Sequence, residues 1–381
     1  MITLLFLIHL IHSLNLDGTE YNEINDRQYL LYYPEAFRSP PSKQTTLPLF
    51  VILHGGSVTS TYFLHKSDFH MVAEDKNFIA LFPEGHCSLD IMCCWNSGHL
   101  RGLLEHNWEV DDMTYLDDLI DFIKTDNIVN KVNIGNIVLT GFSAGGFMTY
   151  TYAINTTRHE IHSIIPVAGS IGGVSAWYQP PQITYNPSNW GVTFKTNVIH
   201  IHGLLDANVL INGGYSYSRY DMSMNDAISF WLNQNECDDV NSTQIETDLD
   251  GTFVLTSYGE CNYGMKVYSL VANEVHHEWS KFDSELQSHT KNNFAIYSQT
   301  LAELIYNLWS YKLLAVEETH MIISDDTTSL IDDDNPYPDS DPDTDIPDDS
   351  CNPIWPFYDC GFGNVITYVS GLIVLIIVIL S

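Results

Sequence analysis

The chain has 381 residues, 45% of them hydrophobic, and its 15 basic and 48 acidic side chains give a formal net charge of −33. This length is enough for one large α/β domain with appendages, or for two ordinary domains. The negative charge argues against a nucleic acid or an anionic membrane surface as a partner, because phosphate groups would repel the protein.

Residues 1–14 are predicted to be a signal peptide. The segment is apolar up to about Ser13, which is long enough for the core of a signal peptide but too short to span a bilayer. The usual basic start is missing, since the first basic residue is Arg27, and a buried N-terminal strand is therefore the alternative. The seven cysteines and the glycosylation sequons at Asn155 and Asn241 also fit a secreted protein.

Residues 15–316 are predicted to form one α/β domain. They alternate short apolar strands with helical patterns, which is typical of a mostly parallel central sheet flanked by helices. We expect strands at 28–33, 49–53, 78–82, 137–140, 163–167, 198–202 and 266–271. We expect helices at 112–124, 147–154, 225–233 and 294–311.

The stretch from Ile137 to Phe147 joins an apolar run to a Gly-x-Ser-x-Gly sequence and then to residues that can continue as a helix. A sharp strand-to-helix turn would lift the Ser143 hydroxyl out of the backbone, and it needs glycine on both sides because a Cβ would clash there. The helix start would also direct N–H groups and a positive dipole end at the reacting atom. The pattern predicts Ser143 as a nucleophile, and an ordinary Gly/Ser turn is the alternative.

An acid that orients the base of such a serine is expected at Asp206. Where this turn occurs, the partners of the serine follow in the order Ser, Asp, His. Asp206 comes shortly after the predicted strand 198–202, at the edge of the sheet where such sites are built. A helix or turn cap is the other common role of an aspartate, and Asp221 and Asp238 are alternative acids.

The general base is expected in the short loop after the strand 266–271, where His276 and His277 are neighbours. A loop histidine late in the domain can reach back over the sheet edge to the serine. Spacing does not choose between the two residues, and a pair of solvated loop histidines is the alternative.

Backbone N–H groups that stabilise an oxyanion are expected from two places. One is Ala144, the residue after the predicted nucleophile. The other is Gly56 in the sequence Leu53-His54-Gly55-Gly56, which follows an early strand, because glycines let a bare N–H approach the developing charge. An ordinary turn is the alternative interpretation of the His-Gly-Gly sequence.

Seven motifs follow one another along the chain: His54-Gly55-Gly56, Phe82-Pro83-Glu84-Gly85, Trp95-Asn96, Val110-Asp111-Asp112, Gly141-Phe142-Ser143-Ala144-Gly145-Gly146, His202-Gly203-x-x-Asp206 and His277-x-Trp279. As a set they resemble the polyhydroxybutyrate depolymerase / feruloyl esterase group of secreted α/β-hydrolases. They fall in the order of that family over roughly residues 28–312, which is most of the chain.

The resemblance implies an α/β-hydrolase fold with Ser143 as nucleophile, Asp206 as acid and His277 as base, and no cofactor or metal ion. It favours His277 because the family has Gly-His-x-Trp here, although this chain has His276 in place of the glycine. Where the family often has a cysteine after His-Gly, this chain has Gly56, and donation by the backbone N–H should survive the change.

The resemblance also implies a disulfide between Cys237 and Cys261. Further candidate pairings are Cys87 with Cys93 or Cys94, and Cys351 with Cys360. A metal site built from cysteines is the alternative, but the sequence has no two CxxC pairs with matching spacing. His200 and His202 point to one face of a predicted strand and are expected to pack there rather than to bind a metal ion.

The composition changes abruptly after Val316. Residues 317–350 are predicted to be an acidic disordered linker, since 325–349 hold eleven aspartates, four prolines and no basic residue. Calcium binding by this segment is the alternative. The tail at 351–381 ends in an apolar run and is expected to be a GPI-anchor signal; a membrane span and a buried core segment are the alternatives.

By resemblance, the expected protein is a secreted or surface-tethered serine esterase. Its expected substrates are hydroxycinnamoyl or acetyl esters of plant cell-wall polysaccharide, followed by hydroxybutyrate polyester. A serine peptidase of the same fold and a catalytically inactive surface protein are the other hypotheses. The sequence gives no indication of the oligomeric state.

Overall fold

The computed structural model describes residues 19–38, 45–88, 92–98, 110–125, 132–175, 191–216, 219–237, 242–247, 253–258, 261–288, 298 and 300–310. Several predictions lie outside these residues: the signal peptide (1–14), the linker (317–350), the tail (351–381), Asp238, Asn241, Cys351 and Cys360. No helix within the described residues has the length and apolarity that crossing a membrane requires.

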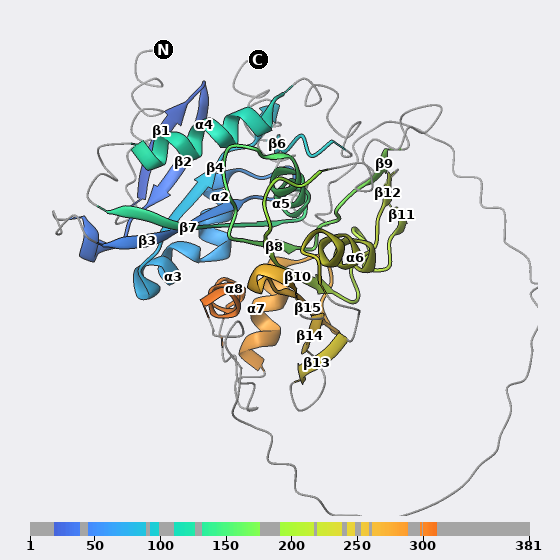
Figure 1. Cartoon of the computed structure of the whole chain (residues 1–381). Coiled ribbons are helices and arrows are strands. Elements are labelled where there is room, and N and C mark those ends of the chain that lie inside the picture. Colours follow the sequence, from blue (N-terminus) through green and yellow to red (C-terminus); the bar gives the residue numbers. More distant parts are fainter. Residues whose placement is uncertain are drawn as a thin grey trace, which may run out of the picture. The chain divides into compact units, whose positions relative to one another are not determined.

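Ten strands form one sheet: β1 (Thr19–Ile24), β2 (Arg27–Tyr32), β3 (Thr46–Leu53), β4 (Ile79–Pro83), β7 (Asn133–Phe142), β8 (Ser163–Val167), β10 (Asn197–Gly203), β13 (Ser242–Thr247), β14 (Phe253–Tyr258) and β15 (Val267–Ala272). Their order in space is β1-β2-β4-β3-β7-β8-β10-β15-β14-β13 (Figure 1). The strands from β4 to β15 run parallel, and two antiparallel strands extend each side. The expected mostly parallel sheet is confirmed.

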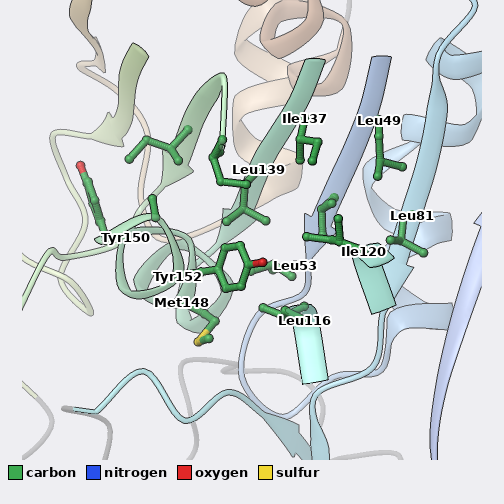
Figure 2. Close-up of a cluster of buried hydrophobic side chains, with 14 of the residues drawn as sticks. Leu49, Leu53, Leu81, Leu116, Ile120, Ile137, Leu139, Met148, Tyr150 and Tyr152 are labelled. Atoms are coloured by element: carbon green, nitrogen blue, oxygen red, sulfur yellow. The ribbon is translucent and has the colours of Figure 1, made fainter. Parts of the chain in front are cut away.

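Helices cover both faces of this sheet: α2 (Ser60–Ser67), α3 (Phe69–Lys76), α4 (Asp112–Thr125), α5 (Ala144–Asn155), α6 (Met224–Gln234), α7 (Trp279–Ser288) and α8 (Leu301–Ser310). Buried side chains of α4, α5 and α6 share one core, and those of α2, α3, α7 and α8 share the other. Figure 2 shows part of the first core, where α4 and α5 meet the strands β3, β4 and β7.

The central strands are apolar on both sides because each side faces a helical layer. Along β3, Leu49, Val51 and Leu53 enter the first core, whereas Phe50 and Ile52 enter the second. A strand buried on both faces therefore appears in the sequence as a continuous apolar run. This explains why the central strands were predicted to within a few residues.

The strand expected at 28–33 corresponds to β2, whereas the antiparallel strands β1, β13 and β14 and the helices α2, α3 and α7 were not predicted. Side chains of β1 are mostly exposed or half-buried, so the sequence of this strand shows no apolar run. The helix predicted at 294–311 corresponds to α8, which begins at Leu301. Two small sheets were also missed, one of β5 (His86–Ser88) with β6 (Met92–Cys94) and one of β9 (Gly173–Ser175), β11 (Gly214–Ser216) and β12 (Arg219–Asp221).

Two disulfides lie in the described part of the chain. Cys237 is joined to Cys261, the pair that the resemblance implies. Cys87 is joined to Cys93 across the β5–β6 pair, and the neighbouring Cys94 is buried in the core. Because both sulfur atoms are bonded to each other, Cys87 and Cys93 offer no thiolate to a metal ion.

Asp283 on α7 gives the fold a titratable contact with α8. Its Oδ1 accepts a hydrogen bond of 2.7 Å from the Leu301 N–H. Burial, and secondarily the charge of Asp68, raise the pKa of Asp283 to about 6. The folded protein therefore binds this proton more tightly than the unfolded chain, so the contribution of Asp283 to stability is full below about pH 4 and is lost as the pH rises through about 6.

We expect Asp283→Asn to stabilise the protein at pH 8, because the amide oxygen can still accept from Leu301 while no charge is buried. The gain should be about 1 to 2 kcal/mol after allowance for solvent screening, and it should vanish at pH 4. Urea unfolding at both pH values measures it. The same gain at pH 4 and pH 8 would contradict the titration argument.

Candidate active site

Ser143 occupies a sharp turn between β7 and α5. Its backbone has φ 54° and ψ −117°, a region that costs energy for any residue with a side chain. The Ser143 N–H donates to Val167 O on β8 at 2.9 Å, and its carbonyl accepts from the Phe147 N–H at 3.0 Å. The backbone around the strained residue is therefore fastened on both sides, to the sheet and to the helix.

The glycines on either side of Ser143 are required by close backbone contacts. A Cβ on Gly141 would lie 2.5 Å from the carbonyl carbon of Gly145, and a Cβ on Gly145 would lie 2.2 Å from Leu53 O. The start of α5 therefore touches the end of β3 with no room for a side chain. This is the steric reason for glycine that the sequence suggested.

His277 lies between Ser143 and Asp206. Its Nδ1 is 2.7 Å from Asp206 Oδ2, and its Nε2 is 2.9 Å from Ser143 Oγ. Since a carboxylate only accepts, Nδ1 carries the proton of the neutral ring, and the lone pair on Nε2 accepts from the Ser143 hydroxyl. Ser143 and His277 are 134 residues apart in the chain. They meet because β7, β10 and β15 end at the same edge of the parallel sheet.

Asp206 is buried and held by four donors. The N–H groups of Asn208 and Val209 both donate to Oδ1 at 2.9 Å. Oδ2 accepts a hydrogen bond from His277 Nδ1 and lies 3.3 Å from His202 Nε2. Burial alone would raise the pKa of Asp206, but hydrogen bonds from His202 and His277 outweigh burial and hold it well below the usual range. Asp206 is therefore a carboxylate throughout the neutral pH range.

The two adjacent histidines, which spacing could not separate, have different surroundings. His276 is exposed, and its Nδ1 lies 3.0 Å from Leu205 O. His277 is buried, with its ring centroid 5.0 Å from that of Phe142. The ring of Trp279, two residues further on, contacts the same phenylalanine edge-on. Only His277 of this pair contacts Ser143.

Asp221, an alternative acid, has a different partner. Its carboxylate accepts from Arg219 Nε at 2.9 and 3.0 Å, and the other end of the guanidinium binds Asn208 O. Asp221 is fully buried, and burial raises its pKa despite the Arg219 charge. This pair braces the loop after Asp206 instead of contacting His277.

The loop after β3 lies against Ser143. A Cβ built on Gly55 would be 3.7 Å from the Ser143 Cβ. Within the described part of the chain, neither the Ala144 N–H nor the Gly56 N–H has a hydrogen-bond acceptor, and both residues are buried. Buried N–H donors without acceptors are the kind of group from which an oxyanion site can be built.

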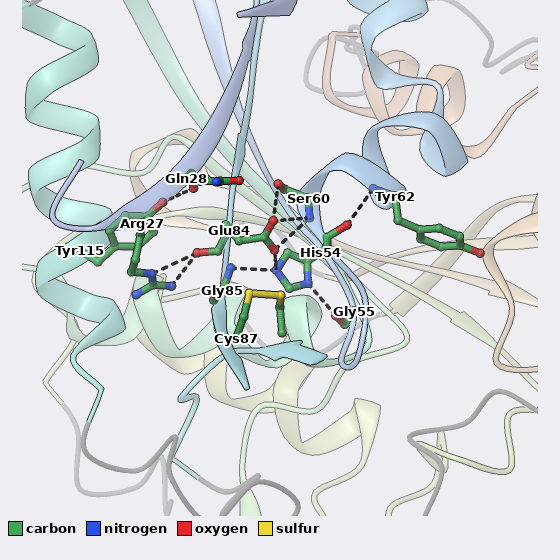
Figure 3. The surroundings of a disulfide bond; sticks show 12 residues. Arg27, Gln28, His54, Gly55, Ser60, Tyr62, Glu84, Gly85, Cys87 and Tyr115 are labelled. Carbon is green, nitrogen blue, oxygen red and sulfur yellow. Dashed lines mark hydrogen bonds and ion pairs between the residues drawn. A yellow bond between two sulfur atoms is a disulfide. The ribbon is translucent and has the colours of Figure 1, made fainter. Parts of the chain in front are cut away.

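His54 fixes the shape of this loop. Its Nε2 accepts from the Gly85 N–H at 2.8 Å, and its Nδ1 donates to Gly55 O at 2.7 Å (Figure 3). Trp95 Nε1 donates to His54 O at 2.9 Å, and the Ser57 N–H donates to Cys93 O at 2.8 Å. The motifs around Glu84 and Trp95 that supported the resemblance are thus supports of the loop, a role that the sequence did not reveal.

His202 packs in the core as expected, since it is buried and its ring stacks on that of His200. It also makes polar contacts that the sequence did not reveal. Its Nε2 lies 2.8 Å from Val209 O as well as near Asp206. The spacing His202-Gly203-x-x-Asp206 was the signal that could have linked the two residues.

A family model described as phospholipase/carboxylesterase matches residues 42–234, about half of the chain. The matched region includes Ser143 and Asp206. Among solved structures, an acetyl xylan esterase from Aspergillus awamori is 14% identical, with a TM-score of 0.44, over 70% of this chain and 97% of that one. The esterase PE8 is 13% identical, with a TM-score of 0.37, over 68% and 97%.

An acylaminoacyl peptidase from Pyrococcus horikoshii is 14% identical, with a TM-score of 0.39, over 72% of this chain and 40% of that one. No curated protein matches the chain. The family match over half of the chain agrees with the sheet order and the turn at Ser143 described above. The chain therefore belongs to the phospholipase/carboxylesterase family and is a serine esterase with the α/β-hydrolase fold.

Proposed function

We propose that this esterase works through a triad of Ser143, His277 and Asp206. The observation that carries the proposal is the pair of short contacts of His277, at 2.9 Å to Ser143 Oγ and 2.7 Å to Asp206 Oδ2. A buried carboxylate fixes the tautomer and orientation of the imidazole, and the imidazole activates the hydroxyl.

In the first half of the reaction, Ser143 Oγ attacks the ester carbonyl carbon while His277 Nε2 takes the hydroxyl proton. The N–H groups of Ala144 and Gly56 donate to the oxyanion of the tetrahedral intermediate. The intermediate collapses, the bond to the alcohol oxygen breaks, and His277 returns the proton to the departing alcohol. Water then attacks the acyl-enzyme with His277 as base, and the acid is released as Ser143 regains its proton.

For the substrate, we propose a hydroxycinnamoyl or acetyl ester of plant cell-wall polysaccharide. Support comes from the seven motifs, which follow the order of the feruloyl esterase and polyhydroxybutyrate depolymerase group. Hydrolysis rates on methyl ferulate, acetylated xylan and hydroxybutyrate oligomers test this choice. Preference for the oligomers would indicate a polyester depolymerase. Hydrolysis of an aminoacyl substrate, with no hydrolysis of any of the three esters, would indicate a peptidase.

We propose further that the protein is exported and held at the cell surface. Two disulfides in the described part are typical of an oxidising compartment, and Asn155 of the first sequon is exposed. Release of the protein from intact cells by a phosphatidylinositol-specific phospholipase would support a GPI anchor. Retention after that treatment, together with extraction by detergent alone, would support a membrane span instead.

Alanine substitution of the two neighbouring histidines should separate their roles. We expect His277→Ala to lower kcat about 10⁴- to 10⁶-fold, because among the described residues no other basic side chain contacts Ser143 Oγ. His276→Ala is the matched control and should keep the wild-type kcat, since its exposed ring lies on Leu205 O. Steady-state kinetics on an aryl acetate measure both. A large loss in the His276 variant alone would reverse the assignment.

A further inference from the structure

Three buried polar side chains form a continuous hydrogen-bonded chain that ends at Asp206. The Tyr150 hydroxyl on α5 lies 2.6 Å from His200 Nδ1, and His200 Nε2 lies 2.9 Å from His202 Nδ1. His202 Nε2 in turn lies 2.8 Å from Val209 O and 3.3 Å from Asp206 Oδ2. Tyr150, His200 and His202 are each at most 1% exposed. His200 and His202 alternate along β10, so their rings stack on the same face of the sheet.

The partners at one end determine the direction of every hydrogen bond in this chain. Val209 O can only accept, so His202 Nε2 must carry a proton. In the neutral ring, His202 Nδ1 then accepts from His200 Nε2–H, and His200 Nδ1 accepts from the Tyr150 hydroxyl. Burial and the neighbouring His202 hold the pKa of His200 well below its usual range, so this ring is neutral.

We propose that Tyr150 and His200 are positioning residues, which lock His202 in the tautomer that donates from Nε2 and thereby orient Asp206 toward His277. The inference rests on the proposed triad and identifies the residues that orient its aspartate. Oδ1 of Asp206 is held by two backbone N–H groups, so the His202 donor completes the fixing of Oδ2, the atom that His277 uses. The buried Asp221, which is paired with Arg219, interacts electrostatically with Asp206 and His202.

Loss of the first donor would propagate along the chain. Without the Tyr150 hydroxyl, His200 Nδ1 has no partner in either tautomer, so the hydrogen bond that favours the Nε2–H tautomer of His200 is lost and the Nδ1–H tautomer can compete with it. In the Nδ1–H tautomer, His200 Nε2 carries a lone pair and needs a donor from His202 Nδ1. If the proton of His202 moves to Nδ1, its Nε2 has no proton to donate to Val209 O or Asp206 Oδ2. The donor to Asp206 is lost even though neither residue next to it has changed.

Two substitutions at His202 test the donor directly. Glutamine can place its amide N–H near the position of His202 Nε2, whereas leucine cannot donate. We expect His202→Leu to lower kcat about 10- to 100-fold with an unchanged KM, as for the loss of one hydrogen bond to a charged group. His202→Gln should recover most of that loss. A glutamine variant as slow as the leucine variant, or a leucine variant as fast as wild type, overturns the proposal.

Two tyrosines of α5 provide a matched pair that preserves the core. Tyr150 and Tyr152 are both fully buried, and Figure 2 shows their rings pointing in different directions. The Tyr152 hydroxyl donates to Asp117 Oδ1 on α4 at 2.7 Å, away from Asp206. We expect both Tyr150→Phe and Tyr152→Phe to lower Tm, but only Tyr150→Phe to lower kcat, about 3- to 10-fold. Equal kcat values for the two variants overturn the proposal, whether or not His202→Leu folds.

A fluorophosphonate probe separates failure of this inference from failure of the proposed function. If Ser143 of the wild type does not react with the probe, the triad itself is wrong. If the wild type reacts and the Tyr150→Phe variant reacts equally fast, the triad stands and the positioning role is wrong. Slower labelling of Tyr150→Phe than of Tyr152→Phe is the result that we expect.

Discussion

Replacement of Ser143 by alanine is expected to abolish ester hydrolysis, with kcat falling about 10⁵- to 10⁶-fold. No other described oxygen nucleophile contacts His277, so the residual rate should come from substrate binding and the oxyanion donors alone. Hydrolysis of an aryl acetate, together with covalent labelling by a fluorophosphonate, measures the loss. The variant should keep about the wild-type Tm, because alanine has the same Cβ at φ 54° and the substitution removes only the hydroxyl that contacts His277.

Ser163 provides the control for this experiment. Its hydroxyl also contacts a histidine, His162 Nδ1 at 2.7 Å, but it lies at the buried start of β8 and away from the turn. Ser163→Ala should therefore hydrolyse esters and take up the probe as the wild type does. Normal turnover by Ser143→Ala would show that Ser143 is not the nucleophile. Loss of labelling in Ser163→Ala would show that the probe reacts with Ser163 instead.

Gly145→Ala is expected to cost more than about 3 kcal/mol of stability, an effect as large as those of severe overpacking. The new Cβ would lie 2.2 Å from Leu53 O and 2.6 Å from His54 O, and both atoms belong to the backbone, which cannot rotate away. Relief would require the start of α5 to move from the end of β3. That movement would also separate the Ala144 N–H from the loop that holds Gly56, so activity should fall with stability.

Urea unfolding measures this loss, and Gly191→Ala is the matched control. A Cβ on Gly191 would have no atom within 4 Å, so that variant should remain within about 0.5 kcal/mol of the wild type. A Gly145→Ala protein as stable as the Gly191→Ala protein would show that the contact between α5 and β3 is looser than the structure describes.

The sequence by itself determined the features whose cause is local. The central strands were predictable because burial on both faces leaves continuous apolar runs such as Leu49–Leu53. The turn at Ser143 was predictable because a side chain on Gly141 or Gly145 would clash with nearby backbone, and glycine at both positions is visible in the sequence. The edge strand β1 was not predicted, because a strand whose side chains are mostly exposed or half-buried needs no continuous apolar run.

Only the tertiary structure decided the features that depend on contacts across the chain. It brought His277 rather than His276 to Ser143, because the direction of each ring is set by packing against Phe142 and by the carbonyl of Leu205. It also gave the buried His202 polar partners that the sequence did not reveal, namely His200 on β10 and Val209 and Asp206 in the loop after β10. Residue types can show which groups are able to form hydrogen bonds, but which of them do so depends on distances that the folded sheet alone sets.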